Sequence, residues 1–186
     1  TMDGQVGWVV SKMLTPVSEE AIRLLGERRE ANGEGVVATP MAVATDTKTG
    51  EQLILTIGTR LPYYKKGTFE VLGKKYKIDP RCVYEIKGER SEVKGEDIVR
   101  VAQSLLNVSY LWGGKNMMGY DCSGFTQTVY SVFGINLLRN AREQVTQGQV
   151  VNSLAEAQPG DLVFFDHADR DPNATRITHV GMLISP

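Results

Sequence analysis

The stretch Gly119-Tyr120-Asp121-Cys122-Ser123-Gly124-Phe125 indicates a thiol on the first turn of a helix. Capping and small residues here precede Phe125, Val129 and Val132-Phe133, which are apolar positions at helical spacing. The sequence therefore predicts a helix that begins near Cys122 and buries one face. At the positive end of such a helix, the macrodipole and the free backbone N–H groups favour a thiolate. Cys122 is thus a candidate nucleophile; considered alone, an ordinary buried cysteine is the alternative.

Three further segments in the second half of the chain accompany this cysteine. They are Tyr110-Leu111-Trp112-Gly113-Gly114, Pro159-Gly160-Asp161-Leu162-Val163-Phe164-Phe165 and Ile177-Thr178-His179-Val180-Gly181-Met182. In order and spacing, the four segments resemble the NlpC/P60 family of cell-wall cysteine peptidases over about residues 95 to 186. The resemblance implies a papain-like α+β fold, in which the cysteine heads a helix packed on an antiparallel sheet. It also implies that a strand of that sheet supplies the histidine.

Of the two histidines, His179 is the candidate partner of the cysteine. It lies in a strand-like run in which alternation places it opposite Val180 and directs it towards the cysteine. A lone strand histidine is more often structural, but its place after the apolar strand of residues 160–165 favours the catalytic role. An imidazole there would take the thiol proton and return one to the leaving amine. His167 lies in the acidic segment 166–176 and is expected at the surface.

The resemblance implies hydrolysis of the γ-D-glutamyl to L-diamino acid bond in murein peptides, through an acyl-enzyme on Cys122. The backbone N–H of Cys122 is a natural oxyanion donor, and the Tyr110 hydroxyl is a candidate for the second. In the subgroup with bacterial SH3-like (SH3b) domains ahead of the peptidase, the residues flanking the cysteine help to hold a free N-terminal L-alanine amine. Those positions are Asp121 and Ser123 here, and helix capping is the alternative role for both.

Two further parts of the site are the third polar residue and the segment 138–144. Cysteine–histidine peptidases usually orient the imidazole through a third polar side chain, which the resemblance implies on the strand after the histidine. The chain ends at Pro186, so this group is expected to be missing or replaced by another polar residue. In the segment 138–144, Leu138 and Asn140 depart from the family pattern. Arg139 and Gln144 are expected to form a buried salt bridge or helix cap rather than to act in catalysis.

The chain before residue 89 predicts two more parts. Residues 36–88 contain five short β-favouring runs, 36–38, 41–44, 52–57, 68–72 and 83–86, separated by turns such as Leu72-Gly73-Lys74. This pattern favours a small β-barrel and resembles an SH3b domain. Residues 1–35 are expected to be the tail of a preceding SH3b domain plus a helical linker, with a strand ending at Val10. That strand would complete the earlier domain or be added to the next one. Residues 89–186 then form the catalytic domain, expected to be incomplete at its C-terminus, with an amphipathic helix over 96–106.

Composition sets the limits on other functions. A hydrophobic content of 41% suits one or two small cores, and a net charge of −1 gives no electrostatic case for nucleic acid. The two cysteines are too few for a disulfide framework or a cysteine-rich metal site, and Cys82 is expected to fill a core. No run approaches the ~20 apolar residues of a membrane span. No cofactor or metal is expected, and the predicted partner is an L-Ala-γ-D-Glu-L-diamino acid peptide bound by a monomer. The cell envelope is the favoured location, with the cytoplasm open.

Rival functions keep the same two catalytic residues, Cys122 and His179. A general peptidoglycan-lytic hydrolase would accept intact murein, and a papain-like amidase or acyltransferase would use another acceptor. A wall-binding module with an inactive peptidase would follow if the third polar residue is truly absent from the natural protein. Release of L-Ala-D-Glu from L-Ala-γ-D-Glu-diaminopimelate would distinguish the peptidase from the transferase.

Overall fold

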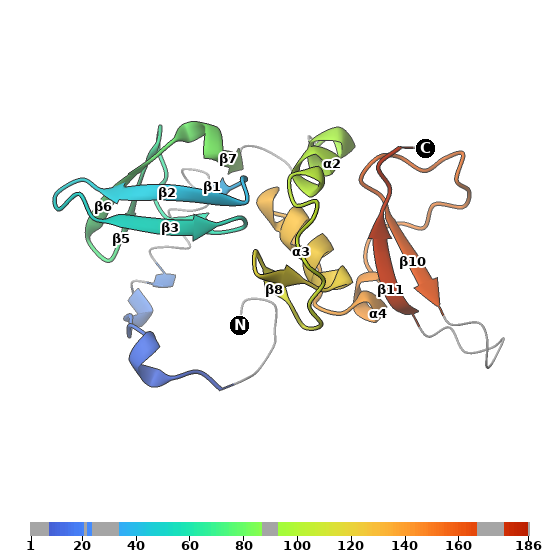
Figure 1. Cartoon of the computed structure of the whole chain (residues 1–186), viewed down its shortest axis with the longest axis horizontal. Helices are drawn as coiled ribbons and strands as arrows, with labels where there is room; N and C mark the ends of the chain where they lie inside the picture. The colour runs from blue at the N-terminus through green and yellow to red at the C-terminus, as the bar shows by residue number, and fades with distance from the viewer. Residues whose placement is uncertain (1–7, 21, 24–33, 87–92, 167–176, 186) are drawn as a thin grey trace.

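The computed structural model describes residues 8–20, 22–23, 34–86, 93–166 and 177–185. Figure 1 shows three parts in a row: a strand-rich part, a helical part around α3, and a two-stranded hairpin. His167 and the first residues of the strand expected before Val10 lie outside the described residues.

The strands of residues 34–86 form two antiparallel sheets, with the orders β4-β1-β7 and β3-β2-β6-β5. Their bounds are β1 (Glu34–Val37), β2 (Met41–Asp46), β3 (Gln52–Thr56), β4 (Arg60–Leu61), β5 (Thr68–Val71), β6 (Lys74–Ile78) and β7 (Val83–Ile86), with the 3-10 turn η2 (Pro80–Cys82). All five β-favouring runs of the sequence are strands. We call residues 34–86 the β unit.

Strand β6 was missed by the sequence reasoning, because Lys74 was taken as part of a turn. The turn consists only of Leu72 and Gly73, both at positive φ (50° and 73°), and pairing resumes at Lys74. A two-residue turn with positive φ at both positions matches the twist of a hairpin. The three lysines of β6 point to solvent, while Tyr76 and Ile78 are buried.

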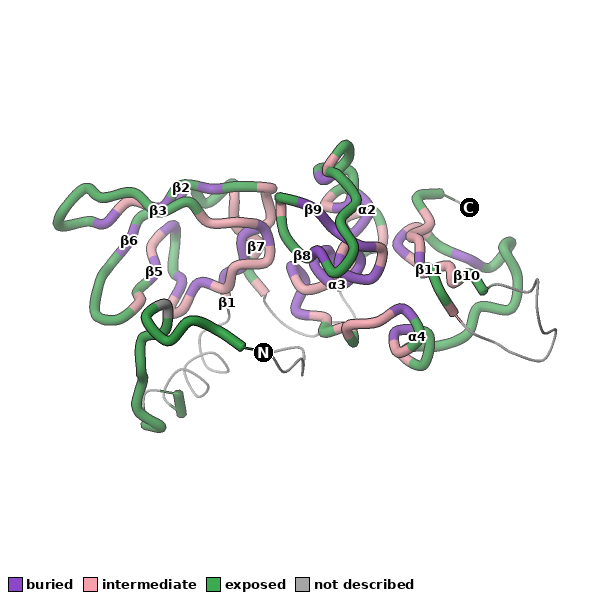
Figure 2. The backbone as a smooth tube through the Cα atoms, turned by 60° about the horizontal axis from the view of Figure 1, so that its bottom comes forward, coloured by how far each residue is buried: buried purple, intermediate pink, exposed green. Residues whose placement is uncertain are grey.

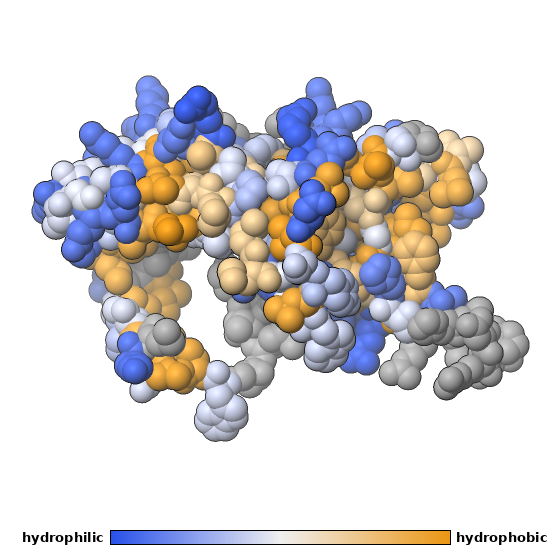
Figure 3. All heavy atoms as spheres, viewed as in Figure 1, coloured by the Kyte–Doolittle hydropathy of each residue, from blue (hydrophilic) through white to orange (hydrophobic). Residues whose placement is uncertain are grey.

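The two sheets enclose one apolar core in the β unit (Figure 2). The partly buried Cys82 packs against this core, as expected for a filler. The core consists of Val37, Ala42, Ala44, Leu61, Tyr64, Phe69, Tyr76 and Ile78. On the opposite face of β2 and β3, the paired Val43 and Ile54 are exposed beside Met41, and Figure 3 shows apolar atoms on this part of the surface.

The second half of the chain is arranged around α3 (Figure 1). Helix α2 and strand β11 both pack against α3, and the short β8–β9 hairpin precedes it. The bounds are α2 (Gly95–Gln103), β8 (Lys115–Asn116), β9 (Gly119–Tyr120), α3 (Cys122–Val132), α4 (Ala141–Gln144), β10 (Leu162–Asp166) and β11 (Ile177–Met182). Helix α2 stops before the expected end at residue 106. Leu105 is still buried, but Leu106 is 70% exposed and lies outside the apolar stripe.

The β unit packs against the C-terminal end of α3. Ile57 belongs to the same apolar cluster as Val129, Val132 and Phe133 of that helix end. The Tyr84 ring of β7 meets Phe133 edge to face, with ring centroids 4.8 Å apart. The two parts therefore share a core and are not merely joined by the linker that the sequence suggested around residue 90.

The strand expected to end at Val10 is wrong in its described portion. Trp8–Val10 is irregular, and the Trp8 side chain is fully exposed. Among the residues that the structure describes, no strand lies beside these three to satisfy their backbone groups, and a strand forms only with such a partner. The chain continues through the turn η1 (Ser11–Met13), and the helical residues 19–20 and 22–23 follow Ser18, as expected for a short helix there.

Candidate active site

Cys122 is the first residue of α3, as the sequence predicts. Asp121 is the N-cap: its backbone is extended, and its Oδ1 accepts a hydrogen bond from the Gly124 N–H at 2.6 Å. This is the usual way in which an aspartate satisfies the free donors of a helix start. Cys122 is only partly buried. The thiol therefore remains accessible at the positive end of the helix, where a thiolate is favoured.

The loop of residues 110–114 presses against this helix start. A Cβ on Gly124 would overlap the carbonyl oxygen of Gly114, so only glycine fits at this position of the first turn. The Asp121 N–H donates to the same carbonyl at 3.0 Å. The two glycines thus bring the loop and the helix into direct backbone contact beside Cys122.

Tyr110 reaches the nucleophile from this loop. Its hydroxyl lies close enough to Cys122 for the backbone and the side chain of that residue to influence the pKa of the phenol. Partial burial raises the pKa of the Tyr110 phenol above its usual 10.0, and the neighbouring Cys122 and Asp121 raise it further. The phenol therefore keeps its proton at neutral pH and can act as a hydrogen-bond donor. The structure brings Tyr110 and Cys122 together.

Asp121 is surrounded by hydrogen-bond donors. Oδ1 accepts from the Gly124 N–H, from the Ser123 hydroxyl at 3.2 Å and from Arg139 Nη1 at 3.0 Å. Oδ2 accepts from the Gly113 N–H at 3.0 Å and from Arg139 Nη2 at 2.7 Å. Burial opposes ionisation, but the hydrogen bonds from Arg139 and Gly124 outweigh it and hold the pKa of Asp121 below its usual 3.8. Asp121 is therefore ionised, and it accepts hydrogen bonds from three parts of the chain: the loop at Gly113, the first turn of α3 and Arg139.

Ser123 faces the interior and is 5% exposed. Its hydroxyl donates to Asp121 and accepts from Arg139 Nη1 at 3.0 Å. Both residues that flank Cys122 are therefore tied into one polar network, which supports the capping alternative of the sequence reasoning. The contact of Asp121 and Ser123 with a substrate amine stays a prediction.

Gln144 of α4 completes the network. It is 1% exposed, and its Nε2 donates to the carbonyls of Ser123 at 3.0 Å and Leu138 at 2.8 Å, while its Oε1 accepts from Thr126. At the start of α4, Glu143 Oε2 accepts from the Asn140 N–H at 3.0 Å and from Asn140 Nδ2 at 2.8 Å. The buried salt bridge expected in this segment is confirmed at Arg139, whereas the cap of α4 is made by Asn140 and Glu143 and not by Gln144. Sequence reasoning did not identify Asp121 as the salt-bridge partner, because 18 residues separate it from Arg139.

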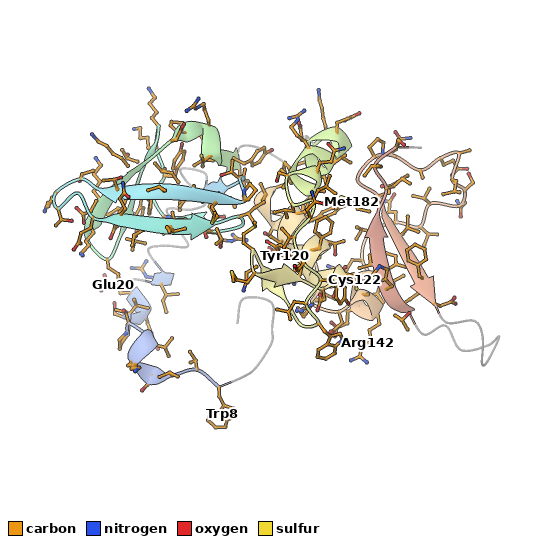
Figure 4. The ribbon with its side chains drawn as sticks, in the orientation of Figure 1. Trp8, Glu20, Tyr120, Cys122, Arg142 and Met182 are labelled. Carbon is orange, nitrogen blue, oxygen red and sulfur yellow. The ribbon has the colours of Figure 1, made fainter. Side chains whose placement is uncertain are left out.

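His179 lies on β11, the strand that packs against α3. It pairs in register with Phe165 of β10, and the two rings lie 5.8 Å apart. His179 is exposed while Val180 is 2% exposed, so the alternation predicted from the sequence is present. Figure 4 places Cys122 at the end of α3 that faces this hairpin.

A second contact fixes the hairpin on α3. The Tyr130 hydroxyl donates to the Gly160 carbonyl at the start of the segment leading into β10, and burial raises the pKa of Tyr130 to about 12. Met182 at the end of β11 packs against the apolar cluster of α3. The helix that carries the thiol and the strand that carries the imidazole are therefore held together on both sides of the hairpin.

Within the part of the chain that the structure describes, no group of three His, Cys, Asp or Glu side chains is arranged to hold a metal ion.

Comparison with known proteins agrees with this arrangement. Residues 107–185 match the NlpC/P60 family. A gamma-D-glutamyl-L-lysine dipeptidyl-peptidase of Bacillus cereus is 29% identical over 98% of this chain and 54% of that protein. A probable endopeptidase p60 of Listeria seeligeri is 42% identical over 47% of this chain and 15% of that protein. The crystal structure of an NlpC/P60 family protein from Bacillus cereus superposes with a TM-score of 0.68 at 26% identity, over 88% of this chain and 55% of that one.

A thiol on the first turn of a central helix, with a histidine strand packed against that helix, defines a domain of the cysteine peptidase class. The match of residues 107–185 to the NlpC/P60 family confirms the resemblance seen in the sequence and a mixed helix and sheet fold. The chain spans about half the length of the curated relatives it matches over most of its own length. None of the described helices is both long and apolar enough to span a bilayer.

Proposed function

We propose that this protein is a cysteine endopeptidase that hydrolyses the γ-D-glutamyl-L-diamino acid bond of murein peptides. The observation that carries the proposal is the position of Cys122 at the start of α3, with the strand of His179 packed on the same helix. The dipeptidyl-peptidase from Bacillus cereus, whose name specifies a gamma-D-glutamyl-L-lysine substrate, aligns with nearly the whole chain and supports this choice of substrate.

In the proposed reaction, His179 accepts the proton of Cys122, and the thiolate sulfur attacks the γ-carbonyl carbon of the D-glutamyl residue. The resulting tetrahedral intermediate collapses when the C–N bond breaks, and the imidazolium gives its proton to the leaving amine. A thioester on Cys122 remains. Water, deprotonated by the same imidazole, then attacks the thioester carbonyl and releases the free γ-carboxylate and the thiol.

Two donors support the negative oxygen of the intermediate. The backbone N–H of Cys122 belongs to the first turn of α3 and so lacks an intrahelical acceptor. The protonated Tyr110 hydroxyl, which lies close to Cys122, is the second donor. A preorganised pair of donors of this kind typically contributes about 10²–10³-fold per donor to the rate.

We further propose that the substrate carries a free N-terminal L-alanine, whose ammonium group binds at Asp121 and Ser123. A carboxylate offers about four acceptor sites, and Asp121 already accepts five hydrogen bonds. An ammonium group must therefore replace a donor rather than join them. The Ser123 hydroxyl, at 3.2 Å the longest of the five, is the donor that it replaces. The freed hydroxyl then accepts from the ammonium group.

The β unit is proposed to be an SH3b domain, within the predicted range of residues 36–88. Its two antiparallel sheets around a single core support this assignment. Residues 1–35 remain proposed as the end of a preceding domain with a linker, and residues 89–186 as the catalytic domain. A monomer that acts on soluble murein peptides completes the proposal.

The decisive experiment is incubation with L-Ala-γ-D-Glu-L-Lys and with its diaminopimelate counterpart, followed by mass analysis. We expect L-Ala-D-Glu and the free diamino acid, and no product from the Cys122→Ala variant. The N-acetylated peptide should react about 30-fold to several thousand-fold more slowly, since it lacks the ammonium charge that the substrate presents to Asp121. Equal rates on free, acetylated and glycan-linked peptides would instead indicate a general lytic hydrolase. Products that retain the acyl group on an added amine would indicate a transferase.

A further inference from the structure

We propose that Arg139 is a positioning residue of the active site, which fixes both neighbours of Cys122 and balances the carboxylate charge beside the thiol. This inference rests on the proposed role of Cys122 as the nucleophile. Arg139 lies 17 positions after Cys122 in the sequence and just before α4, in the segment 138–144 in which Leu138 and Asn140 depart from the family pattern.

The contact between Arg139 and Asp121 has the geometry of a built pair. Nη1 lies 3.0 Å from Oδ1 and Nη2 lies 2.7 Å from Oδ2, so that the guanidinium plane engages both carboxylate oxygens. The two side chains are 12% and 11% exposed. Only arginine offers two parallel donors of this kind, since the lysine ammonium is a point charge.

The same guanidinium holds the residue on the other side of the nucleophile. Arg139 Nη1 also donates to the Ser123 hydroxyl at 3.0 Å. Because Cys122 lies between Asp121 and Ser123, its backbone is fixed from both directions by one side chain. Through Asp121, the contact extends to the Gly113 N–H, and therefore to the loop that carries Tyr110.

Arg139 is itself held in place by the chain around it. The carbonyl of Leu138, the preceding residue, accepts a hydrogen bond from the fully buried Gln144, which also holds the Ser123 carbonyl. The backbone that carries Arg139 and the first turn of α3 are thus joined by a second, uncharged link. The guanidinium does not have to be ordered when substrate arrives.

Charge gives Arg139 a role beyond packing. A carboxylate directly before the cysteine repels a thiolate and opposes the favourable effect of the helix start. The paired guanidinium cancels most of that repulsion at close range. Loss of Arg139 would therefore slow the chemistry of the thiol even in molecules that remain folded.

The test compares four variants by the rate at which iodoacetamide alkylates Cys122, by kcat and KM on the peptide, and by Tm. They are Arg139→Gln, Arg139→Lys, the double variant Asp121→Asn/Arg139→Gln, and the control Arg142→Gln, which removes the same charge from an exposed position three residues away. We expect Arg139→Gln to lower both the alkylation rate and kcat by about 100-fold, with a smaller change in KM. Arg139→Lys should recover part of the loss, and Arg142→Gln should stay within about twofold of the wild type.

The double variant separates charge from packing. Asparagine caps helices about as well as aspartate, so the double variant keeps a cap but has no unpaired charge. Its alkylation rate should exceed that of Arg139→Gln by about tenfold.

Wild-type alkylation and kcat in Arg139→Gln would overturn the proposal, as would a double variant that is no faster than Arg139→Gln. Since alkylation needs no peptide, it tests Arg139 even if the proposed substrate is wrong. If Arg139→Gln does not fold, a folded double variant that alkylates within about tenfold of the wild-type rate supports the proposal, and one that is about 100-fold slower than the wild type overturns it.

Discussion

The two ends of helix α3 are built in opposite ways. At the N-terminal end, buried polar groups surround Cys122, and Asp121, Ser123 and Arg139 satisfy one another. At the C-terminal end, Val132 and Phe133 are buried in an apolar cluster that includes Ile57 of the β unit. Buried polar networks contribute little net stability but fix geometry, whereas apolar burial contributes most of the stability. One end of the helix therefore positions the chemistry, and the other end attaches the helix to the rest of the molecule.

The sharpest test of this contrast is Cys122→Ala. Loss of the nucleophile should lower kcat by about 10⁴-fold or more, while the partly exposed side chain contributes little packing and Tm stays near the wild type. Peptide turnover and thermal unfolding measure the two effects. Cys82→Ala is the matched control, because Cys82 is also partly buried but packs in the β unit. Residual activity of Cys122→Ala above about one per cent would contradict the assignment.

The opposite result is expected at the other end of the helix. Phe133 is 2% exposed and meets Tyr84 edge to face. Phe133→Ala should lower the free energy of unfolding by about 3–5 kcal/mol, and Phe133→Leu by less, because the cavity is smaller. Urea denaturation measures the loss, and kcat of the folded fraction should hardly change. A large fall in kcat with unchanged stability would remove the distinction between the two ends.

Alkylation compares the two cysteines directly. In the native protein at neutral pH, iodoacetamide should label Cys122 about 100-fold faster than Cys82, since only Cys122 lies at a helix start with polar partners. Peptide mapping by mass spectrometry resolves the two sites. Partial burial is common to both residues, so it would not by itself produce a difference. Labelling at equal rates would show that the helix start does not activate the thiol.

The smallest expected effect is a change in the pH dependence of stability. Because the pKa of Asp121 is lowered on folding, its ionised form stabilises the folded state above the ordinary value of 3.8, and this contribution is lost as the pH falls below it. The wild type should exceed Asp121→Asn by about 1–3 kcal/mol near neutral pH. The difference should shrink as the pH falls below 3.8, because the carboxyl group then becomes protonated and its ion pair with Arg139 is lost. Parallel unfolding curves of both proteins measure it, and a difference that does not vary with pH would show that Asp121 is not ionised in the network.

The local sequence determined the start of α3, the five β-favouring strands and the alternation of His179 with Val180. Each of these depends on neighbours a few residues away: an aspartate cap three residues before a free N–H, an alternation of period two, or an apolar stripe of period near 3.6. Each of these patterns lies within a single helix or strand, so it can be recognised from the sequence of that element alone. The strand expected before Val10 had a similar local pattern, but a strand also needs a neighbouring strand, and the described residues provide none beside Trp8–Val10.

Only the tertiary structure decided which distant residues share the site and the core. Asp121 and Arg139 are 18 residues apart, and the sequence indicated a salt bridge at Arg139 without its partner. Ile57 and Phe133 are further apart, and their common cluster makes the β unit part of the same core as α3. Charged and apolar side chains contact the residues that lie near them in the folded chain. Which residues lie near depends on how all the helices and strands pack together.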